Sequence, residues 1–168
     1  IRDRTSTLFR SEDSGEMHGL TRVRQFTITE AHNVIRPDQA EEELKNCFDL
    51  AYYVLSTLGL QDDVTYRLSK WDPANKKKYL GDEDYWNRTQ EALREVLREK
   101  GVPFVEADGE AAFYGPKLDV NVKPAVGNEI TLSTCQLDFC LPEKFDLKYV
   151  DKDGTKKTPV VLHRAILG

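Results

Sequence analysis

Apolar residues between Pro37 and Leu58 recur every three or four positions, which is the spacing that places side chains on one face of a helix. Pro37 suits the first helical position, and Gly59 suits the residue just past the last turn. The apolar stripe consists of Ala40, Leu44, Cys47, Ala51, Val54, Leu55 and Leu58. The pattern predicts an amphipathic helix over 37–58.

A second helix is predicted to begin after Asp82, whose side chain can cap it, and to end at Gly101. Its buried stripe would consist of Trp86, Leu93, Val96 and Leu97. Before it, residues 64–69 alternate as a strand does, and residues 71–80 are predicted to form a loop. The lysines of this loop, Lys76, Lys77 and Lys78, could meet RNA phosphate or simply form a solvated turn.

The rest of the chain favours strands. Residues 8–32 are predicted to form two extended segments joined by a polar loop, and residues 102–105 resume an extended chain. Residues 117–122 and 129–139 alternate, and 145–150 with 155–162 are predicted as a hairpin around the turn Asp153-Gly154. The order of elements predicts an α+β fold, an antiparallel β-sheet with helices on its outer face.

Composition and charge limit the possible functions. The chain has 168 residues, 39% hydrophobic and 32% charged, so it fits one domain or a compact piece of a larger one. Its net charge of -5 does not indicate a basic nucleic-acid platform, and no DNA partner is expected. The three cysteines, Cys47, Cys135 and Cys140, show neither metal-ligand spacing nor a disulfide framework, which favours small buried residues in a reducing compartment.

No apolar run is long enough to span a bilayer and no signal peptide opens the chain, so we expect no membrane partner and a cytoplasmic location. The chain opens at Ile1 without an initiator Met and ends at Gly168 where a helix or turn should begin. We therefore expect an excised segment of a longer protein.

The stretch 8–32 carries unusual chemistry. With a period of two, Arg10 and Glu12 would share a face of the first strand, and Arg22, Arg24 and Phe26 a face of the second. Guanidinium groups bind phosphate, a carboxylate accepts an exocyclic amine, and an aromatic ring covers a base. These groups together describe an ATP site, against the alternative of an exposed strand pair with salt bridges.

The ordered pattern Phe-Arg-x-Glu-x-Ser-Gly-x-x-His-Gly-Leu-x-Arg-Val-Arg-x-Phe from Phe9 to Phe26 resembles motif 2 of the class II aminoacyl-tRNA synthetases, and closely that of the threonyl-tRNA synthetase family. Residues 112–117 and 163–168 resemble the same family in the same order. The resemblance implies that Arg10 bridges the ATP α-phosphate and the amino-acid carboxylate, as the catalytic residue. It also implies that Glu12 binds the adenine amine, Arg22 binds phosphate and Phe26 stacks on adenine.

The resemblance also implies a zinc site and a threonine pocket. His32 and His163 would be two zinc ligands, and the family's third ligand is a cysteine upstream of motif 2, with which none of the three cysteines aligns. Glu30, Tyr114, Lys117 and Gln136 would line the pocket for threonine, although Tyr114 could instead be a core aromatic residue. His18 would lie where the acceptor end of tRNA approaches, or be merely exposed.

Three positions depart from the family pattern. Glu30 stands where most members carry an aspartate, and Ile28 replaces a polar residue that contacts the substrate. Thr131 stands where a glutamine usually assists nucleotide binding. These departures place substrate geometry, or even activity, in question.

The leading hypothesis is that residues 1–168 are part of a class II synthetase catalytic domain, without motif 1, the zinc cysteine, motif 3 and the anticodon-binding domain. The parent would use ATP with Mg2+ and Zn2+ to join threonine to tRNA(Thr), as a homodimer, and the segment alone would be inactive or nearly so. The alternatives are a related synthetase for serine or proline, or a non-catalytic relative that binds nucleotide or RNA.

Overall fold

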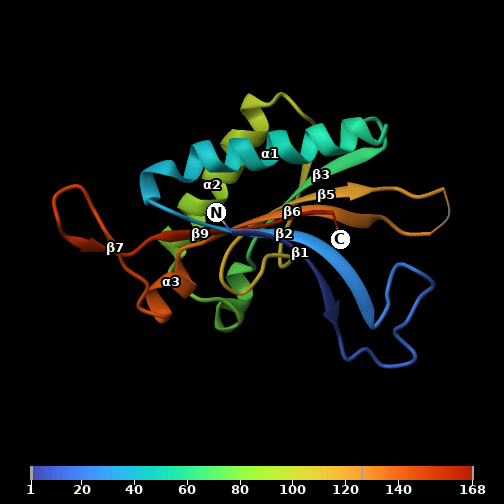
Figure 1. Ribbon diagram of the computed structural model, residues 1–168, viewed down its shortest axis with the longest axis horizontal. Coiled ribbons are helices and arrows are strands. Elements are labelled where there is room, and N and C mark those ends of the chain that lie inside the picture. Colours follow the sequence, from blue (N-terminus) through green and yellow to red (C-terminus); the bar gives the residue numbers. More distant parts are fainter. Residues whose placement is uncertain (1, 126, 168) are drawn as a thin grey trace.

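The computed structural model describes residues 2–125 and 127–167, and gives an α+β fold built on one large sheet (Figure 1). The strands of the chain are β1 (Arg2–Phe9), β2 (Gln25–Ile35), β3 (Val64–Ser69), β4 (Phe104–Ala107), β5 (Lys117–Val122), β6 (Ile130–Asp138), β7 (Tyr149–Val150), β8 (Lys156–Lys157) and β9 (Val160–Leu167). The helical segments are η1 (Pro37–Gln39), α1 (Ala40–Thr57), η2 (Pro73–Lys78), α2 (Glu83–Glu99) and α3 (Cys140–Lys144). The predicted fold class is therefore confirmed.

Seven strands form the main sheet in the order β1-β2-β9-β6-β5-β3-β4. Every neighbouring pair in it is antiparallel except β3 and β4, which are parallel. Helices α1 and α2 lie on one face of the sheet, above it in Figure 1. No long helix among the residues that the structure describes covers the opposite face, which we call the open face.

The hydrophobic core lies between the sheet and the two long helices. The strand pairing brings Leu68, Leu118, Cys135 and Leu162 to the same face, because the side chains of a strand alternate and paired residues share a face. Helix residues such as Leu44 and Leu93 are buried against them. Each buried Leu contributes about 1.5–3 kcal/mol relative to an exposed one, which makes this layer the main source of stability.

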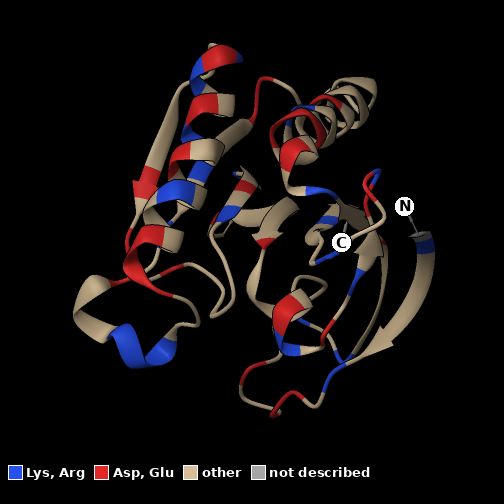
Figure 2. Ribbon diagram, turned by 90° about the vertical axis from the view of Figure 1, so that its left-hand side faces the viewer, with Lys and Arg blue, Asp and Glu red and all other residues tan. Residues whose placement is uncertain are grey.

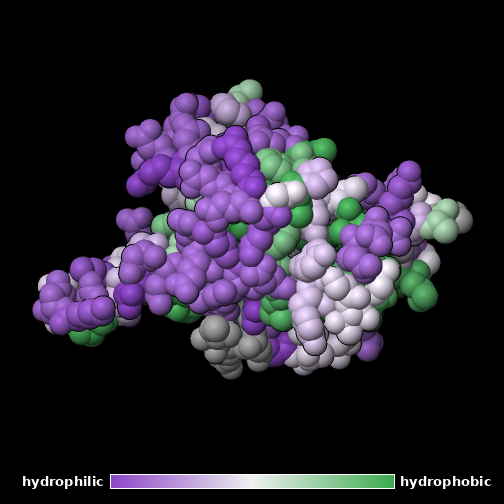
Figure 3. Space-filling view, turned by 90° about the horizontal axis from the view of Figure 1, so that it is seen from above, coloured by the Kyte–Doolittle hydropathy of each residue, from purple (hydrophilic) through white to green (hydrophobic). Residues whose placement is uncertain are grey.

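The outer surface of the helices is polar, as both predicted stripes require. Figure 3, viewed from the helix side, shows mostly hydrophilic residues over the helices, and Figure 2 shows acidic and basic residues along them. Both helix predictions are confirmed, with Pro37 opening a short 3-10 turn before α1 and Asp82 capping α2 through the backbone N–H of Tyr85, 2.8 Å from its Oδ1. No helix among the described residues is long and apolar enough to cross a membrane.

A second, aromatic cluster anchors the segment between β3 and α2. Trp71 stacks on Trp86 with ring centroids 5.6 Å apart, and the Trp86 indole donates to the carbonyl of Leu80 at 2.7 Å. The segment that was predicted to be a loop contains the 3-10 turn η2, because Asp72 caps it and Pro73 opens it. Lys76 pairs with Glu83 and Lys78 donates to the carbonyl of Gly109, so both lysines serve the fold.

Two strand predictions are wrong in their pairing or extent. The predicted hairpin of 145–150 with 155–162 is reduced to the two-residue strands β7 and β8, and residues 160–167 join the main sheet as β9. Residues 140–144, just before the predicted hairpin, form α3, where the backbone N–H groups of Cys140 and Leu141 donate to Asp138 Oδ1.

In the segment 8–32, β1 ends at Phe9 and β2 begins at Gln25, so Arg10, Glu12, Arg22 and Arg24 lie in the connection and not on the strands.

Candidate functional site

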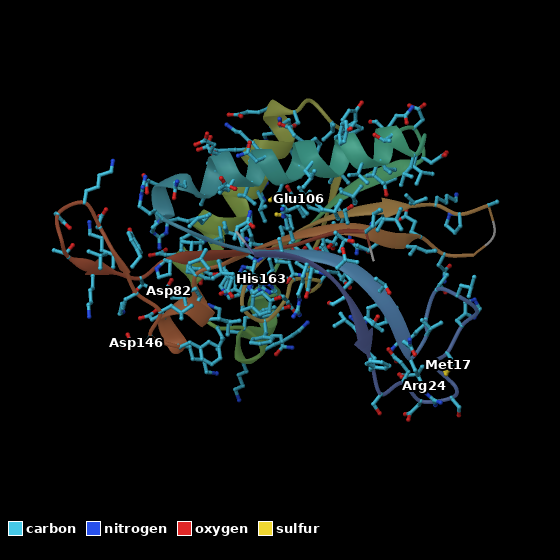
Figure 4. All side chains as sticks on the ribbon, viewed as in Figure 1. Met17, Arg24, Asp82, Glu106, Asp146 and His163 are labelled. Atoms are coloured by element: carbon cyan, nitrogen blue, oxygen red, sulfur yellow. The ribbon has the colours of Figure 1, made fainter. Side chains whose placement is uncertain are left out.

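The open face carries a row of polar side chains that crosses four adjacent strands. His32 of β2 pairs with His163 of β9, His163 pairs with Gln136 of β6, and Gln136 pairs with Lys117 of β5. Paired residues on adjacent strands project from the same face, so the sheet brings together residues from four distant parts of the chain. Figure 4 shows His163 on the opposite side of the sheet from α1.

Tyr114 joins this row from the turn before β5. Its hydroxyl donates to Gln136 Oε1, and its ring lies 5.1 Å from the His163 ring, centroid to centroid. Burial raises the pKa of Tyr114, so the hydroxyl stays protonated and remains a donor at neutral pH. The alternative of a core aromatic residue accounts for the half-buried ring but not for the hydroxyl, which contacts Gln136, another residue predicted to line the threonine pocket.

Gly115 makes the Tyr114 turn possible. A Cβ atom at this position would lie 1.9 Å from the carbonyl oxygen of Leu137, so only glycine allows the turn to pack against β6. The Tyr85 hydroxyl donates to the carbonyl of Tyr114 at 2.8 Å and secures the other side of the turn. The Gly-Pro bend therefore places Tyr114 and Lys117 beside Gln136.

The two histidines are in contact. The rings of His32 and His163 lie 4.9 Å apart, centroid to centroid, with the edge of one toward the face of the other. His163 Nε2 lies 2.9 Å from Oδ2 of Asp138, a carboxylate that is fully buried. Partial burial, and after it the charge of His163, lowers the pKa of His32, which favours the neutral imidazole.

The residues predicted to bind ATP lie together at the β1–β2 connection. The guanidinium carbon of Arg10 lies 4.9 Å from the centre of the Phe26 ring. Arg22 pairs with Glu12, with Nη2 2.9 Å from Oε2, and the Arg24 Nε–H donates to the Glu12 carbonyl at 2.9 Å. The hydrogen bond from Arg22 lowers the pKa of Glu12, so Glu12 is ionised at neutral pH.

Comparison with known proteins identifies the group to which this arrangement belongs. A sequence profile of the tRNA synthetase class II core domain (G, H, P, S and T) matches residues 3–168. The chain belongs to this family. Class II synthetase core domains act with ATP, which agrees with the grouping of Arg10, Glu12 and Phe26.

Three of the relatives are a threonine–tRNA ligase and two threonyl-tRNA synthetases, one of them putative. The threonine–tRNA ligase of Clostridium perfringens (strain SM101 / Type A) is 56% identical over 164 residues, which is 98% of this chain and 26% of that protein. A solved RNA binding domain of threonyl-tRNA synthetase from Cryptosporidium parvum Iowa II superposes with a TM-score of 0.84 at 38% identity, over 97% of this chain and 40% of its own. The putative threonyl-tRNA synthetase ThrRS-1 of Aeropyrum pernix gives 0.79 at 35% identity, over 96% and 38%.

The expected resemblance to threonyl-tRNA synthetases is thus confirmed. The chain spans about a quarter of the length of the curated relatives it matches.

His32 and His163 are the two residues predicted to bind zinc. Two adjacent imidazoles, one of them backed by the Asp138 carboxylate, have the donor chemistry of part of a zinc site. Within residues 2–125 and 127–167, no group of three or more His, Cys, Asp or Glu side chains is placed to hold a metal ion. The described residues therefore fit two positions of such a site but do not complete it.

Glu30 has a partner that the sequence did not reveal. The Arg4 guanidinium on the neighbouring strand binds the Glu30 carboxylate, with Nη2 2.8 Å from Oε1. The two residues pair across β1 and β2, and Glu30 stands two residues before His32 on the same face of β2. Only the register of β1 against β2 could have indicated this contact, because 26 positions separate the residues.

His18 is not brought to the row. It lies in the exposed β1–β2 connection, where its backbone N–H donates to the Arg22 carbonyl at 3.1 Å. In Figure 4 its neighbour Met17 lies well away from His163, on the other side of the view.

Ile28 lies between Phe26 and Glu30 on the same face of β2, half-buried, and Thr131 donates from its hydroxyl to Asn121 Oδ1 at 2.7 Å.

Sequence reasoning also missed two buried carboxylates, Asp138 and Asp119. Asp138 Oδ2 lies 2.9 Å from His163 Nε2, and Asp119 Oδ2 lies 3.3 Å from Lys117 Nζ. Both stand at alternate positions from predicted site residues, Asp138 from Gln136 and Asp119 from Lys117. That spacing was the available signal, because side chains two apart on a strand share a face.

Proposed function

We propose that this chain is the ATP- and threonine-binding part of a threonine–tRNA ligase, which activates threonine as threonyl-adenylate and transfers it to tRNA(Thr). The observation that carries the proposal is the row of His32, His163, Gln136 and Lys117 with Tyr114, in a chain 56% identical to such a ligase. The further proposals are that ATP is taken with Mg2+, and that the full-length protein is a cytoplasmic homodimer.

The activation step needs cations at the ATP end. When the threonine carboxylate attacks the α-phosphorus, negative charge grows on that phosphate and on the departing pyrophosphate. Arg10, which is exposed and lies beside Phe26, would move toward the α-phosphate and the carboxylate as adenine stacks on the Phe26 ring. Glu12 would accept the adenine amine, and Arg22 would bind phosphate.

Threonine would lie on the row. The Tyr114 hydroxyl, Gln136, Lys117 and the Glu30 carboxylate are the polar groups available to its amine and hydroxyl. A pocket that hydrogen-bonds a substrate hydroxyl rejects a substrate that lacks the hydroxyl, because its own polar groups are then left unpaired. His32 and His163 would supply two ligands of a zinc ion.

The test measures amino-acid-dependent exchange between pyrophosphate and ATP. It uses a protein as long as the curated relatives that contains residues 1–168, which we call the full-length protein. We expect exchange with threonine and little with serine or proline. Arg10→Ala should reduce kcat/KM by about 10²- to 10³-fold, because it removes a cation from the developing charge. Exchange that is as fast with serine or proline would contradict the assignment.

A second candidate is a non-catalytic relative of the synthetases. One observation favours it: Arg4 already binds the Glu30 carboxylate, which the threonine pocket would need. Such a protein would show no exchange with any amino acid in its full-length form. In such a protein, removal of the Arg4 charge by Arg4→Gln would not produce any threonine-dependent exchange. In an active ligase the same substitution should change the KM for threonine.

A further inference from the structure

A buried carboxylate lies on the open face beside the predicted threonine pocket. Asp119, near the middle of β5, is 1% exposed. Its Oδ2 lies 3.3 Å from Lys117 Nζ, 3.3 Å from Arg67 Nη2 and 2.8 Å from the Ser69 hydroxyl. Its Oδ1 accepts a hydrogen bond from the Thr134 hydroxyl at 2.8 Å. Both oxygens are therefore engaged by donors from three adjacent strands.

This arrangement is demanding to maintain. A carboxylate removed from water is destabilising unless charged and hydrogen-bonding partners replace the water. Asp119 has two cations and two hydroxyls, so it is fully compensated. With Arg67 and Lys117 opposite a single carboxylate, the cluster carries a net positive charge of about one unit.

The partners of Asp119 connect it to the row. Lys117 pairs with Gln136 across β5 and β6, and Thr134 stands two residues before Gln136 on the same face of β6. The Lys117 side chain is 22% exposed, so part of it contacts solvent while its ammonium group contacts the buried Asp119 carboxylate. The Asp119 carboxylate thus contacts Lys117, a residue of the predicted pocket, and Thr134, which stands two residues before Gln136.

We propose that Asp119 is a positioning residue for the threonine pocket, which acts by fixing the Lys117 ammonium. Asp119 is covered by its four partners and does not itself touch the substrate. This inference rests on the proposed function of the same site. It assigns the precision of threonine binding to a buried residue beside the pocket.

The test is a double-mutant cycle in the full-length protein, with threonine-dependent pyrophosphate exchange as the readout. Asp119→Asn keeps the size of the side chain but removes the charge that holds Lys117. We expect it to raise the KM for threonine about tenfold, with the KM for ATP unchanged within about twofold. Lys117→Met should have a similar effect, and the double variant should be no worse than Lys117→Met alone, because Asp119 acts through Lys117.

A matched control separates positioning from stability. Glu106→Gln also breaks an ion pair, since Glu106 binds Arg94 Nε at 2.6 Å and Lys70 Nζ at 3.0 Å, but it lies on the helix side of the sheet (Figure 4). It should lower the urea midpoint and leave the KM for threonine unchanged. If Asp119→Asn does not fold, Ser69→Ala removes one hydroxyl from Asp119 and should raise the same KM by a smaller factor.

The outcomes are distinct. Independent, multiplying effects of Asp119→Asn and Lys117→Met, or equal changes in the KM for ATP and for threonine, would overturn the inference and leave the proposed function intact. If the wild-type full-length protein shows no threonine-dependent exchange, the proposed function fails and the inference fails with it. Non-additive effects confined to the KM for threonine would support both.

Discussion

Tyr114 shows how a single side chain can be tuned by its surroundings. Burial raises the pKa of its hydroxyl, and that hydroxyl donates to Gln136 Oε1 within the row. Tyr114→Phe leaves the ring but removes the donor, so Gln136 loses the partner that orients its amide. We expect the KM for threonine in the full-length protein to rise about tenfold, the worth of one hydrogen bond, while the KM for ATP stays unchanged. Pyrophosphate exchange with varied threonine checks this, and an unchanged KM would contradict it.

The residues that carry a motif could be predicted individually, but their partners could not. Arg10, Glu12, Phe26, His32, Tyr114 and His163 were named from sequence, and the structure brings His32, Tyr114 and His163 into contact. The partners of Glu30 and His163 are Arg4 and Asp138, which lie 26 and 25 positions away. A local pattern does not report strand register, so contacts of this kind emerge only from the paired sheet.

At the scale of elements, the turn before β5 depends on one glycine. Gly115→Ala would place a methyl group 1.9 Å from the Leu137 carbonyl oxygen, so the turn or β6 would have to move. We expect a loss of about 3 kcal/mol or more in the free energy of unfolding, in the range of severe overpacking.

Urea unfolding of the two alanine variants, Gly115→Ala and Gly15→Ala, measures this effect. Gly15 is the matched control, because nothing lies within 4 Å of a Cβ built there and its backbone is not in the left-handed region. Gly15→Ala should leave the free energy of unfolding nearly unchanged. Equal effects of the two substitutions would contradict the account of the turn.

The edge strand β4 is tied to α2 by a charge network whose strength should depend on pH. The hydrogen bond from Arg94 is the main cause that lowers the pKa of Glu106, from 4.5 to about 2. A carboxyl group with a lowered pKa in the folded state stabilises the fold above its unfolded pKa, and this contribution is lost as pH falls toward the folded value.

Glu106→Gln should therefore lower the free energy of unfolding by about 1–2 kcal/mol at pH 7, as expected for a hydrogen-bonded charge that is only partly exposed. The difference between wild type and variant should shrink as pH falls from about 4.5 toward about 2. Urea unfolding at several pH values measures it. A difference that stays constant down to pH 3 would contradict the role of this carboxylate.

The long elements were predictable and the short ones were not. Periodicity over 17 or 18 residues defines α2 and α1 well, and β3 and β5 were predicted with the bounds that they have. Helix α3 has five residues, and β7 and β8 have two each, too few for any period to show. Residues 155–162 were assigned to the hairpin because the turn Asp153-Gly154 is a local signal, whereas the pairing of residues 160–167 with β2 and β6 is not.

At the scale of the molecule, the sheet has one face for stability and one for chemistry. The side toward α1 and α2 carries the aliphatic core, and the open face carries the polar row and the Asp119 cluster (Figure 1). Phe26, predicted to stack on adenine, and His32, predicted to bind zinc, both lie on β2, which runs from Gln25 to Ile35. The expectation that the isolated segment is inactive or nearly so remains a prediction.

The most direct measurement is calorimetric titration of the full-length protein with a non-hydrolysable threonyl-adenylate analogue, which would occupy both ends of the open face at once. We expect one analogue to bind per chain, with an affinity at least about tenfold higher than that of the seryl analogue, and we expect Arg10→Ala to abolish binding. Absence of binding by the wild-type protein, or equal binding of the seryl analogue, would contradict it.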